Sequence, residues 1–430
     1  MEHQHVPHLR TAGIEPLSLL EKKIIDEQIK IETWFRQAFQ DKPTIITSSV
    51  DIRNAGFKIA PVDTNLFPAG FNNLSVDSYP LAIQALQFTI EKFHPKCQKI
   101  LIIPESHTRN PHYFESLYVL SNLLMKAGFE IRIGSLIAEE SPIVIQVLDK
   151  DQLTLRPLIL EENRIIAENF RACMVLLNND FSDGIPDIIM QSKQLITPPP
   201  QLGWKHRLKS MHFEFYQKIT EEFSKVIDID PWYITPEFED CGEINFVDKV
   251  GEECLIEKTE RLFQNIKKKY KEHKIERNPF VVIKANQGTY GMAVMMVQSS
   301  EELKNLNRKQ RQKMAKSKGG QAVNHVIIQE GVHTIETVGT QHSVAEPVVY
   351  MIGNHVVGGF YRVHINKGPE ENLNAPGMHF EPLAFDECCN NPDNRISTHA
   401  SQNKFYVYSV IARLALLATC HEAENIGSQL

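Results

Sequence analysis

The stretch 278–297 constrains the fold most, because it joins an apolar run to a lysine, a glycine-bearing turn and a second apolar run. Residues 280–283 are apolar and rich in β-branched side chains, which predicts a buried strand that ends at Lys284. The turn 286–291 supplies two glycines, and 292–297 predicts a second strand. Glycine lets a backbone approach phosphate oxygens and a lysine adds a point charge, so this unit suits phosphate binding.

A plain β-hairpin that ends in a lysine is the alternative interpretation of the same residues. The stretch is not a Walker A loop, because Gly-Lys-Ser/Thr is absent and no helix follows the turn directly.

The length and charge of the chain narrow its class. A chain of 430 residues is too long for one core, so two or three domains are expected. A net charge of −7 argues against a dedicated nucleic-acid binder. The apolar run 410–418 is interrupted by Arg413 and is too short to span a membrane, so no membrane association is predicted.

The cysteines and the N-terminus predict a cytoplasmic protein. The first residues lack the charged-then-apolar pattern of a signal peptide. Seven scattered cysteines include no Cys-x-x-Cys pair, which is typical of reduced thiols. The adjacent Cys388 and Cys389 have no histidine or further cysteine nearby, which favours ordinary thiols over a redox or metal site.

The first half of the chain alternates helical and strand patterns. We expect a mainly parallel α/β layer with strands at 44–48, 99–104, 129–133 and 174–177, helices at 16–40, 77–94 and 111–127, and a hairpin over 144–159. Ligands of such sheets lie beyond the carboxyl ends of the strands, which draws attention to Glu105 and Arg109. Solvated or locally paired side chains are the alternative.

Residues 51–74 predict a loop, because their glycines and prolines exclude a long helix. A zwitterionic ligand would suit this segment, its ammonium near a carboxylate and its carboxylate near a cation. The alternative is a structural loop whose asparagines cap its own turns. The candidate residues here are Arg53, Lys58, Asp63, Asn65 and Asn72.

The three prolines that begin at Pro198 predict a stiff extended segment and a domain boundary, with domains at 1–196 and 197–430. The second part predicts helices at 202–223, 252–274, 299–320 and 402–423, a strand at 325–329 and a hairpin over 345–364. The basic residues of 308–318 could attract nucleic acid, but aromatic side chains for base stacking are absent there.

The order of elements from 279 onward resembles the ATP-grasp ligase fold of the glutathione-synthetase type. That resemblance implies an N-terminal α/β, pre-ATP-grasp-like layer followed by an ATP-grasp-like α+β domain. It implies that Lys284 contacts ATP phosphates and that Arg362 faces the transferred phosphoryl group. The implied nucleotide contacts are the loop residues Gln287, Gly288, Thr289, Tyr290 and Gly291, the base-pocket residues Gln329, Glu330 and Val332, and Asn372 near the phosphates.

Longer strings resemble the compact bacterial glutamate–cysteine ligase family. They occupy 57–74, 103–110, 197–205 and 284–292. This resemblance implies that ATP drives the joining of the γ-carboxyl of L-glutamate to L-cysteine through an acyl phosphate, the first step of glutathione biosynthesis. On this hypothesis the loop residues 53–72 named above, with Glu105 and Arg109, hold the amino acids.

The metal ligands depart from the ATP-grasp pattern. That family commonly holds Mg²⁺ with carboxylates and a Glu-x-Asn sequence after the last helix, but here Glu424 directly precedes Asn425. The spacing occurs earlier, at Glu370 and Asn372, and Glu346 opens a predicted strand. These three residues are the candidate Mg²⁺ ligands.

Two other functions stay open. One is another carboxylate–amine ligase, such as a glutathione synthetase, and the other is a non-catalytic nucleotide- or nucleic-acid-binding protein. The expected partners are small-molecule substrates, with self-association into a homo-oligomer left open.

Overall fold

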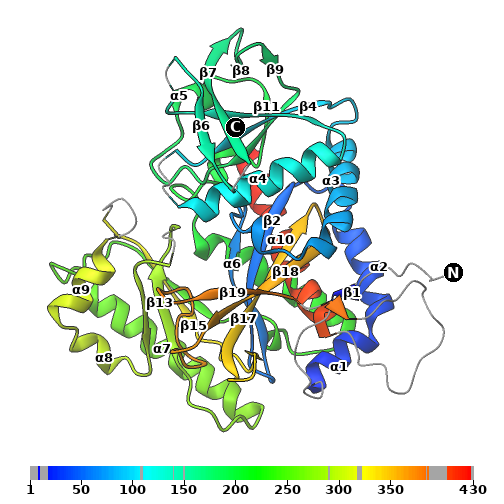
Figure 1. Ribbon diagram of the computed structural model, residues 1–430. Coiled ribbons are helices and arrows are strands. Elements are labelled where there is room, and N and C mark those ends of the chain that lie inside the picture. The colour runs from blue at the N-terminus through cyan, green and yellow to red at the C-terminus, as the bar shows by residue number, and fades with distance from the viewer. Residues whose placement is uncertain are drawn as a thin grey trace.

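The computed structural model describes residues 8–9, 18–106, 110–138, 140–148, 151–288, 291–316, 322–383, 385–386 and 404–427. Three main sheets and the helices packed on them make a mixed α/β protein, as predicted (Figure 1). A short pair, β1 (His8–Leu9) with β20 (Phe385–Asp386), lies apart from them.

The N-terminal sheet has eight strands in the order β11-β10-β4-β5-β7-β8-β9, with β6 beside β7. Strands β11, β10, β4, β5 and β7 run parallel, whereas β6, β8 and β9 add antiparallel pairs. The bounds are β4 Lys99–Pro104, β5 Glu130–Ser135, β6 Ile143–Gln146, β7 Gln152–Glu161, β8 Arg164–Ala167, β9 Phe170–Arg171, β10 Met174–Asn178 and β11 Leu195–Thr197.

Both faces of this sheet are covered, which explains the unbroken apolar run in β4, where Ile100 to Ile103 have no exposed surface. Helices α3 (Tyr79–Phe93) and α4 (Pro111–Lys126) pack on one face. Side chains of α6 (Lys209–Ile227) and α10 (Lys404–Gly427) belong to the core on the other face. The start of α6 at Lys209 is later than the predicted residue 202, because 200–202 form a 3₁₀ turn.

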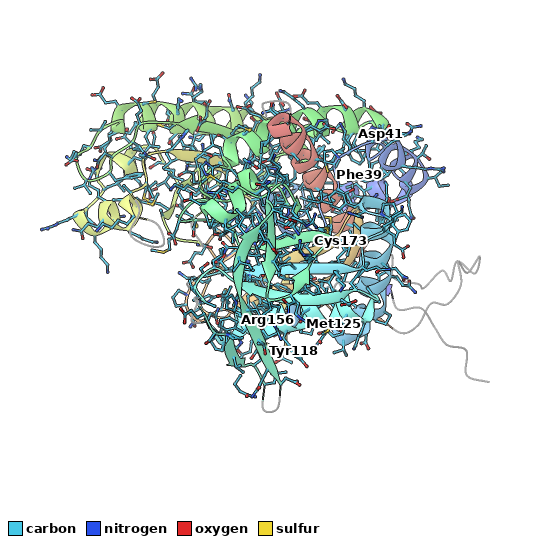
Figure 2. The ribbon with its side chains drawn as sticks, turned by 90° about the horizontal axis from the view of Figure 1, so that it is seen from above. Phe39, Asp41, Tyr118, Met125, Arg156 and Cys173 are labelled. Carbon is cyan, nitrogen blue, oxygen red and sulfur yellow. The ribbon has the colours of Figure 1, made fainter. Side chains whose placement is uncertain are left out.

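The predicted helix 16–40 is two helices, α1 (Leu19–Asp26) and α2 (Gln28–Ala38), which break at Glu27. A capping box between Ser18 and Glu21 begins α1. Figure 2 shows α10 beside the end of α2, marked by Phe39 and Asp41, and nearby Lys42 forms a 3.0 Å ion pair with Glu424.

The central sheet has six strands in the antiparallel order β19-β18-β17-β2-β3, with β16 beside β17. The core cluster that contains α10 lies on one of its faces. The bounds are β2 Thr47–Asn54, β3 Ile59–Asn65, β16 Thr337–Val338, β17 Ser343–Ile352, β18 His355–His364 and β19 His379–Pro382.

The prediction that 51–74 is a loop was wrong for its first part, which forms the hairpin β2–β3. Its turn holds Gly56 at a positive φ of 83°. Pro61 lies in β3, the edge strand of the sheet, where a missing N–H is tolerated.

The small sheet is antiparallel and has four strands in the order β12-β15-β13-β14. It confirms the predicted strands on either side of the glycine-bearing turn. Helix α7 (Glu252–Glu272) packs on it, and the predicted helix 299–320 is two shorter helices, α8 (Glu301–Lys304) and α9 (Arg308–Ala315). The strands are β12 Phe238–Cys241, β13 Val281–Ala285, β14 Val294–Val297 and β15 Val326–Glu330.

The central sheet joins strands from both sides of residue 196, because β2 pairs with β17. The division into 1–196 and 197–430 stays a prediction. No helix in the described part of the chain is long and apolar enough to cross a membrane. Cys388 and Cys389 lie outside the described residues.

Candidate functional site

A cavity of about 120 Å³ lies between the central sheet and the small sheet. We call it the central cavity. Most of the predicted nucleotide and metal residues line it, together with two residues predicted to bind substrate. These lining residues are Arg53, Asp63, Lys284, Gly291, Gln329, Glu330, Val332, Glu346, Arg362, Glu370 and Asn372.

Lys284 is held at the end of β13 with 9% of its surface exposed. Its Nζ donates a 2.6 Å hydrogen bond to the carbonyl of Val62. Burial lowers the pKa of Lys284 to about 8, although the nearby Asp63 carboxylate opposes that change. The ammonium of Lys284 lines the cavity, so it could contact a bound anion in place of the Val62 carbonyl.

The glycine-bearing turn is anchored by the segment that leads into α6. Asn286 accepts backbone hydrogen bonds of 2.8 Å from Lys209 N, at its carbonyl oxygen, and from Ser210 N, at Oδ1. Gln287 donates to the carbonyl of Lys205 at 2.7 Å. Thr289 and Tyr290 lie outside the described residues.

Glycine is required at both described glycines of this turn. A Cβ at Gly288 would lie 2.0 Å from the Trp204 ring, and Gly291 has a positive φ of 76°. Gln287 and Gly288 do not line the central cavity, whereas Gly291 does.

Arg362 and Arg53 both donate hydrogen bonds to the carboxylate of Glu346. Glu346 lies opposite Arg362 across the β17–β18 pair and accepts from Arg362 Nη1 at 2.5 Å and from Arg53 Nε at 2.8 Å. Burial alone would raise the pKa of Glu346, but the two guanidinium groups hold it below its ordinary value. Arg53 also donates to the backbone carbonyls of Val332, Pro369 and Glu371.

Asp51 was not among the residues predicted from the sequence, yet it lines the cavity and accepts from Arg362 Nη1 at 2.8 Å. Burial raises the pKa of Asp51, while Arg362 opposes the increase. Its neighbour Asp63 accepts from Lys209 Nζ at 2.6 Å. Burial would raise the pKa of Asp63 too, but Lys209 and Lys284 hold it well below its ordinary value.

Several buried polar atoms of the central cavity have no hydrogen-bond partner among the described residues. Gln329 Nε2 and Glu330 Oε1 are two of them, on residues that are each 2% exposed. Arg362 Nε is a third. Leaving a buried polar group unpaired is costly, so these atoms indicate a polar ligand.

Lys58 is buried beside Glu330, which lines the central cavity. It forms a 2.6 Å ion pair with Glu330 and lies 4.0 Å from the ring centre of Trp232. Burial lowers the pKa of Lys58, opposed by Glu330.

Asn65, Asn72 and Glu105, which were also predicted to bind substrate, do not line the central cavity. Asn65 Oδ1 caps the turn at Phe67 N, and Asn72 donates to Glu115 at 3.2 Å. Glu105 follows β4 and accepts from Asp180 N at 3.4 Å. Arg109 lies outside the described residues.

The three predicted metal ligands all have partners of their own. Glu370 accepts from Gln298 Nε2 and contacts His333 Nε2, both at 3.1 Å, and Asn372 accepts from Asn374 N. In the described part of the chain, three metal-ligating atoms cluster at Asp230, Glu272 and His273, and none of these residues lines the cavity.

Comparisons with known proteins identify the family of the chain. The glutamate–cysteine ligase family model matches residues 21–423. A protein from Methylobacillus flagellatus KT, assigned as a γ-glutamylcysteine synthetase, is 48% identical over 99% of this chain and 100% of its own, with a TM-score of 0.86. No curated protein matches the sequence significantly.

Two further solved structures are similar over much of the chain at 10% identity and a TM-score of 0.36. One is a D-alanyl-alanine synthetase A from Vibrio cholerae, covering 74% of this chain and 81% of its own. The other is a glutathione synthetase-like effector from Globodera pallida, and the similarity covers 88% of this chain and 90% of the effector's chain. At these TM-scores neither establishes a shared fold. The family match over nearly the whole chain confirms the predicted enzyme class, and the chain belongs to the glutamate–cysteine ligase family.

Proposed function

We propose that this glutamate–cysteine ligase binds ATP in the central cavity. The observation that carries the proposal is the pair of unpartnered atoms on Gln329 and Glu330, a donor and an acceptor buried at one wall. Such a pair suits the polar edge of a purine, and Val282, Val294 and Met296 give the cavity apolar walls for its faces. Lys284 and Arg362 line the same cavity and would meet the phosphates.

The reaction needs ATP because a carboxylate does not react with an amine at neutral pH. We propose that an oxygen of the glutamate γ-carboxylate attacks the γ-phosphorus of ATP, with ADP as the leaving group. The cysteine amine, having lost a proton, then attacks the acyl carbon and expels phosphate. Lys284, Arg362 and the loop amides would position the phosphoryl group and spread its charge.

The amino acids would bind between the central cavity and the carboxyl ends of β4 and β10. Asn72 Oδ1 is buried without a described partner, and Glu105 follows β4. Asn65 at the end of β3 and Arg109 after β4 belong to the same proposal. Arg53 and Lys58 are fully engaged with Glu346 and Glu330, so we propose that they shape the cavity instead of holding substrate.

An ATP-grasp-like arrangement, with the nucleotide between the two antiparallel sheets, is the finer fold proposal. Magnesium is the expected cation, because hard cations prefer carboxylate oxygens and the cavity supplies them at Asp51 and Asp63. The location proposed is the cytoplasm, which cell fractionation would test. Nucleic acid is not a proposed partner, since Arg311 of the basic stretch is engaged with Glu252 at 2.9 Å.

Phosphate release from Mg-ATP tests the reaction directly. Release should require glutamate and cysteine together, and mass spectrometry should detect γ-glutamylcysteine. Release that is independent of both amino acids, or supported equally by another acceptor amine, would contradict the proposal.

A further inference from the structure

We propose that Asp51 and Asp63 of the hairpin β2–β3 hold the divalent cation that accompanies the nucleotide, in place of Glu346, Glu370 and Asn372. The inference rests on the proposed ATP site. It assigns the metal to the N-terminal part of the chain, about 220 residues before Lys284 in the sequence.

The register of the hairpin brings the two carboxylates together. Asp51 and Asp63 are direct cross-strand partners, so their side chains leave the same face of the central sheet. Asn65 lies two residues beyond Asp63 and leaves that face as well. Both aspartates line the central cavity.

The other candidate ligands are less free to bind a cation. Both oxygens of Glu346 are held, by Arg53 and by Arg362. Both oxygens of Glu370 are in contact with neighbours as well.

Each of the two aspartates has one carboxylate oxygen that accepts no hydrogen bond from a described residue. The hydrogen bonds with described residues use Oδ2 of Asp51 and Oδ1 of Asp63. Oδ1 of Asp51 and Oδ2 of Asp63 have no such bond among the described residues. Mg²⁺ commonly takes one or two carboxylates and completes its shell with phosphate oxygens and water, which matches this supply.

The charges in the cavity also suit such a cation. Asp51, Asp63 and Glu346 place three carboxylates on the wall that a triphosphate would approach. Arg362 already shares one nitrogen between two of them, at 2.8 and 2.5 Å. A divalent cation between the aspartates and the phosphates would turn repulsion into attraction.

Buried polar atoms without a described partner indicate a polar ligand in the same cavity. Gln329 and Glu330 are each 2% exposed and keep polar atoms without a described partner. A nucleotide that pairs with these atoms and extends toward Lys284 would carry its phosphates past Asp51 and Asp63.

The test measures metal binding and not turnover. Electron paramagnetic resonance counts free Mn²⁺ during titration of the full-length protein with a non-hydrolysable ATP analogue present. Asp63→Asn should weaken Mn²⁺ binding about tenfold or more, because a neutral amide replaces a charged ligand. Asp51→Asn is the second variant and should act in the same direction.

Two matched variants serve as controls. Glu370→Gln makes the same change at a rival ligand, and Asp77→Asn makes it at an exposed site outside the cavity. Both should keep wild-type Mn²⁺ affinity. Wild-type affinity in folded Asp51→Asn and Asp63→Asn, or a tenfold loss in Glu370→Gln, would overturn the assignment.

Binding of the analogue to the wild-type protein in excess Mg²⁺ separates this inference from the proposed function. If the wild-type protein does not bind the analogue at all, the proposed ATP site fails. If the analogue binds and the Asp63→Asn and Asp51→Asn variants still bind Mn²⁺ normally, only the metal assignment fails.

Discussion

The indole of Trp204 packs on the backbone of Gly288, so closely that an added Cβ would lie 2.0 Å from its Cδ2 atom. Gly288 N also approaches the carbonyl of Trp204 at 3.4 Å. The segment that precedes α6 therefore sets the position of the glycine-bearing turn.

Gly288→Ala should displace this turn, because the new methyl group cannot share space with the indole ring. A shift of about 1 Å in a phosphate-positioning loop can reduce turnover ~100-fold. Steady-state kinetics would measure the loss. Adding Trp204→Ala should restore part of the turnover, and a double variant no better than Gly288→Ala would contradict the steric explanation.

Lys284→Ala should reduce turnover ~100-fold, because the buried ammonium would no longer stabilise charge on the phosphoryl group. Thermal unfolding should change little, since the only hydrogen bond that Lys284 donates within the described part of the chain goes to Val62. Lys218→Ala, on the exposed side of α6, is a matched control. Turnover close to wild type in Lys284→Ala would remove the phosphate role.

Arg53→Ala should act on stability more than on amino-acid affinity. The substitution would leave the buried Glu346 with one guanidinium partner, at a cost of about 3 kcal/mol. Urea unfolding measures that cost. A large increase in the KM for glutamate or cysteine without loss of stability would restore Arg53 to the substrate site.

Glu422 predicts how stability depends on pH. It pairs with Arg207 and His212, at 2.7 and 2.5 Å. Burial would raise the pKa of Glu422, but the charge of Arg207 and the hydrogen bonds from both partners hold it at about 2. A carboxyl with a lowered folded-state pKa stabilises the protein above its unfolded pKa and loses that stability as pH falls. Burial lowers the pKa of His212, so protonation of this histidine also favours unfolding in acid.

Glu422→Gln should therefore cost about 3 kcal/mol near neutral pH and should flatten the loss of stability between about pH 4.5 and pH 2. Chemical unfolding across that range would measure both effects. An unchanged slope in the variant would mean that other carboxyl groups control acid unfolding.

Cys241 and Cys254 predict a response to oxidation. Their sulfur atoms lie 3.7 Å apart, and a disulfide needs about 2.05 Å. Burial raises the pKa of Cys241 to about 12, whereas Cys254 is exposed, so an oxidant such as diamide should react first at Cys254. Mass spectrometry should then detect a Cys241–Cys254 link, with Cys254→Ser as the control. Free thiols at both positions after diamide would contradict the prediction.

The local elements were predictable because their patterns repeat within a few residues. The strand that ends at Lys284 and the β17–β18 hairpin follow from apolar runs and turn glycines. The pairing of β2 with β17 was not predictable in this way, because the local sequence of a strand does not indicate which distant strand it pairs with.

The strand that carries Asp51 has a sequence pattern that indicates it. Val50 and Ile52 are buried in one core, while Ser49, Asp51 and Arg53 alternate with them, a period of two residues that indicates a strand. Gly56 and Pro61 lie close by, and their tendency to interrupt regular structure led to the prediction of a loop instead. Asp63 and Asn65 also have the acidic-x-Asn spacing that was expected near the C-terminus.

The placement of β2 between β3 and β17 also affects how the chain folds during synthesis. Asp51 pairs with Val348, a partner made about 300 residues later, which takes ~15–60 s at about 5–20 residues per second. During that interval the edge of β2 that later pairs with β17 is exposed, and an exposed strand edge is prone to pair with other chains. A nascent chain of this enzyme should therefore depend on protection by chaperones until β17 leaves the ribosome.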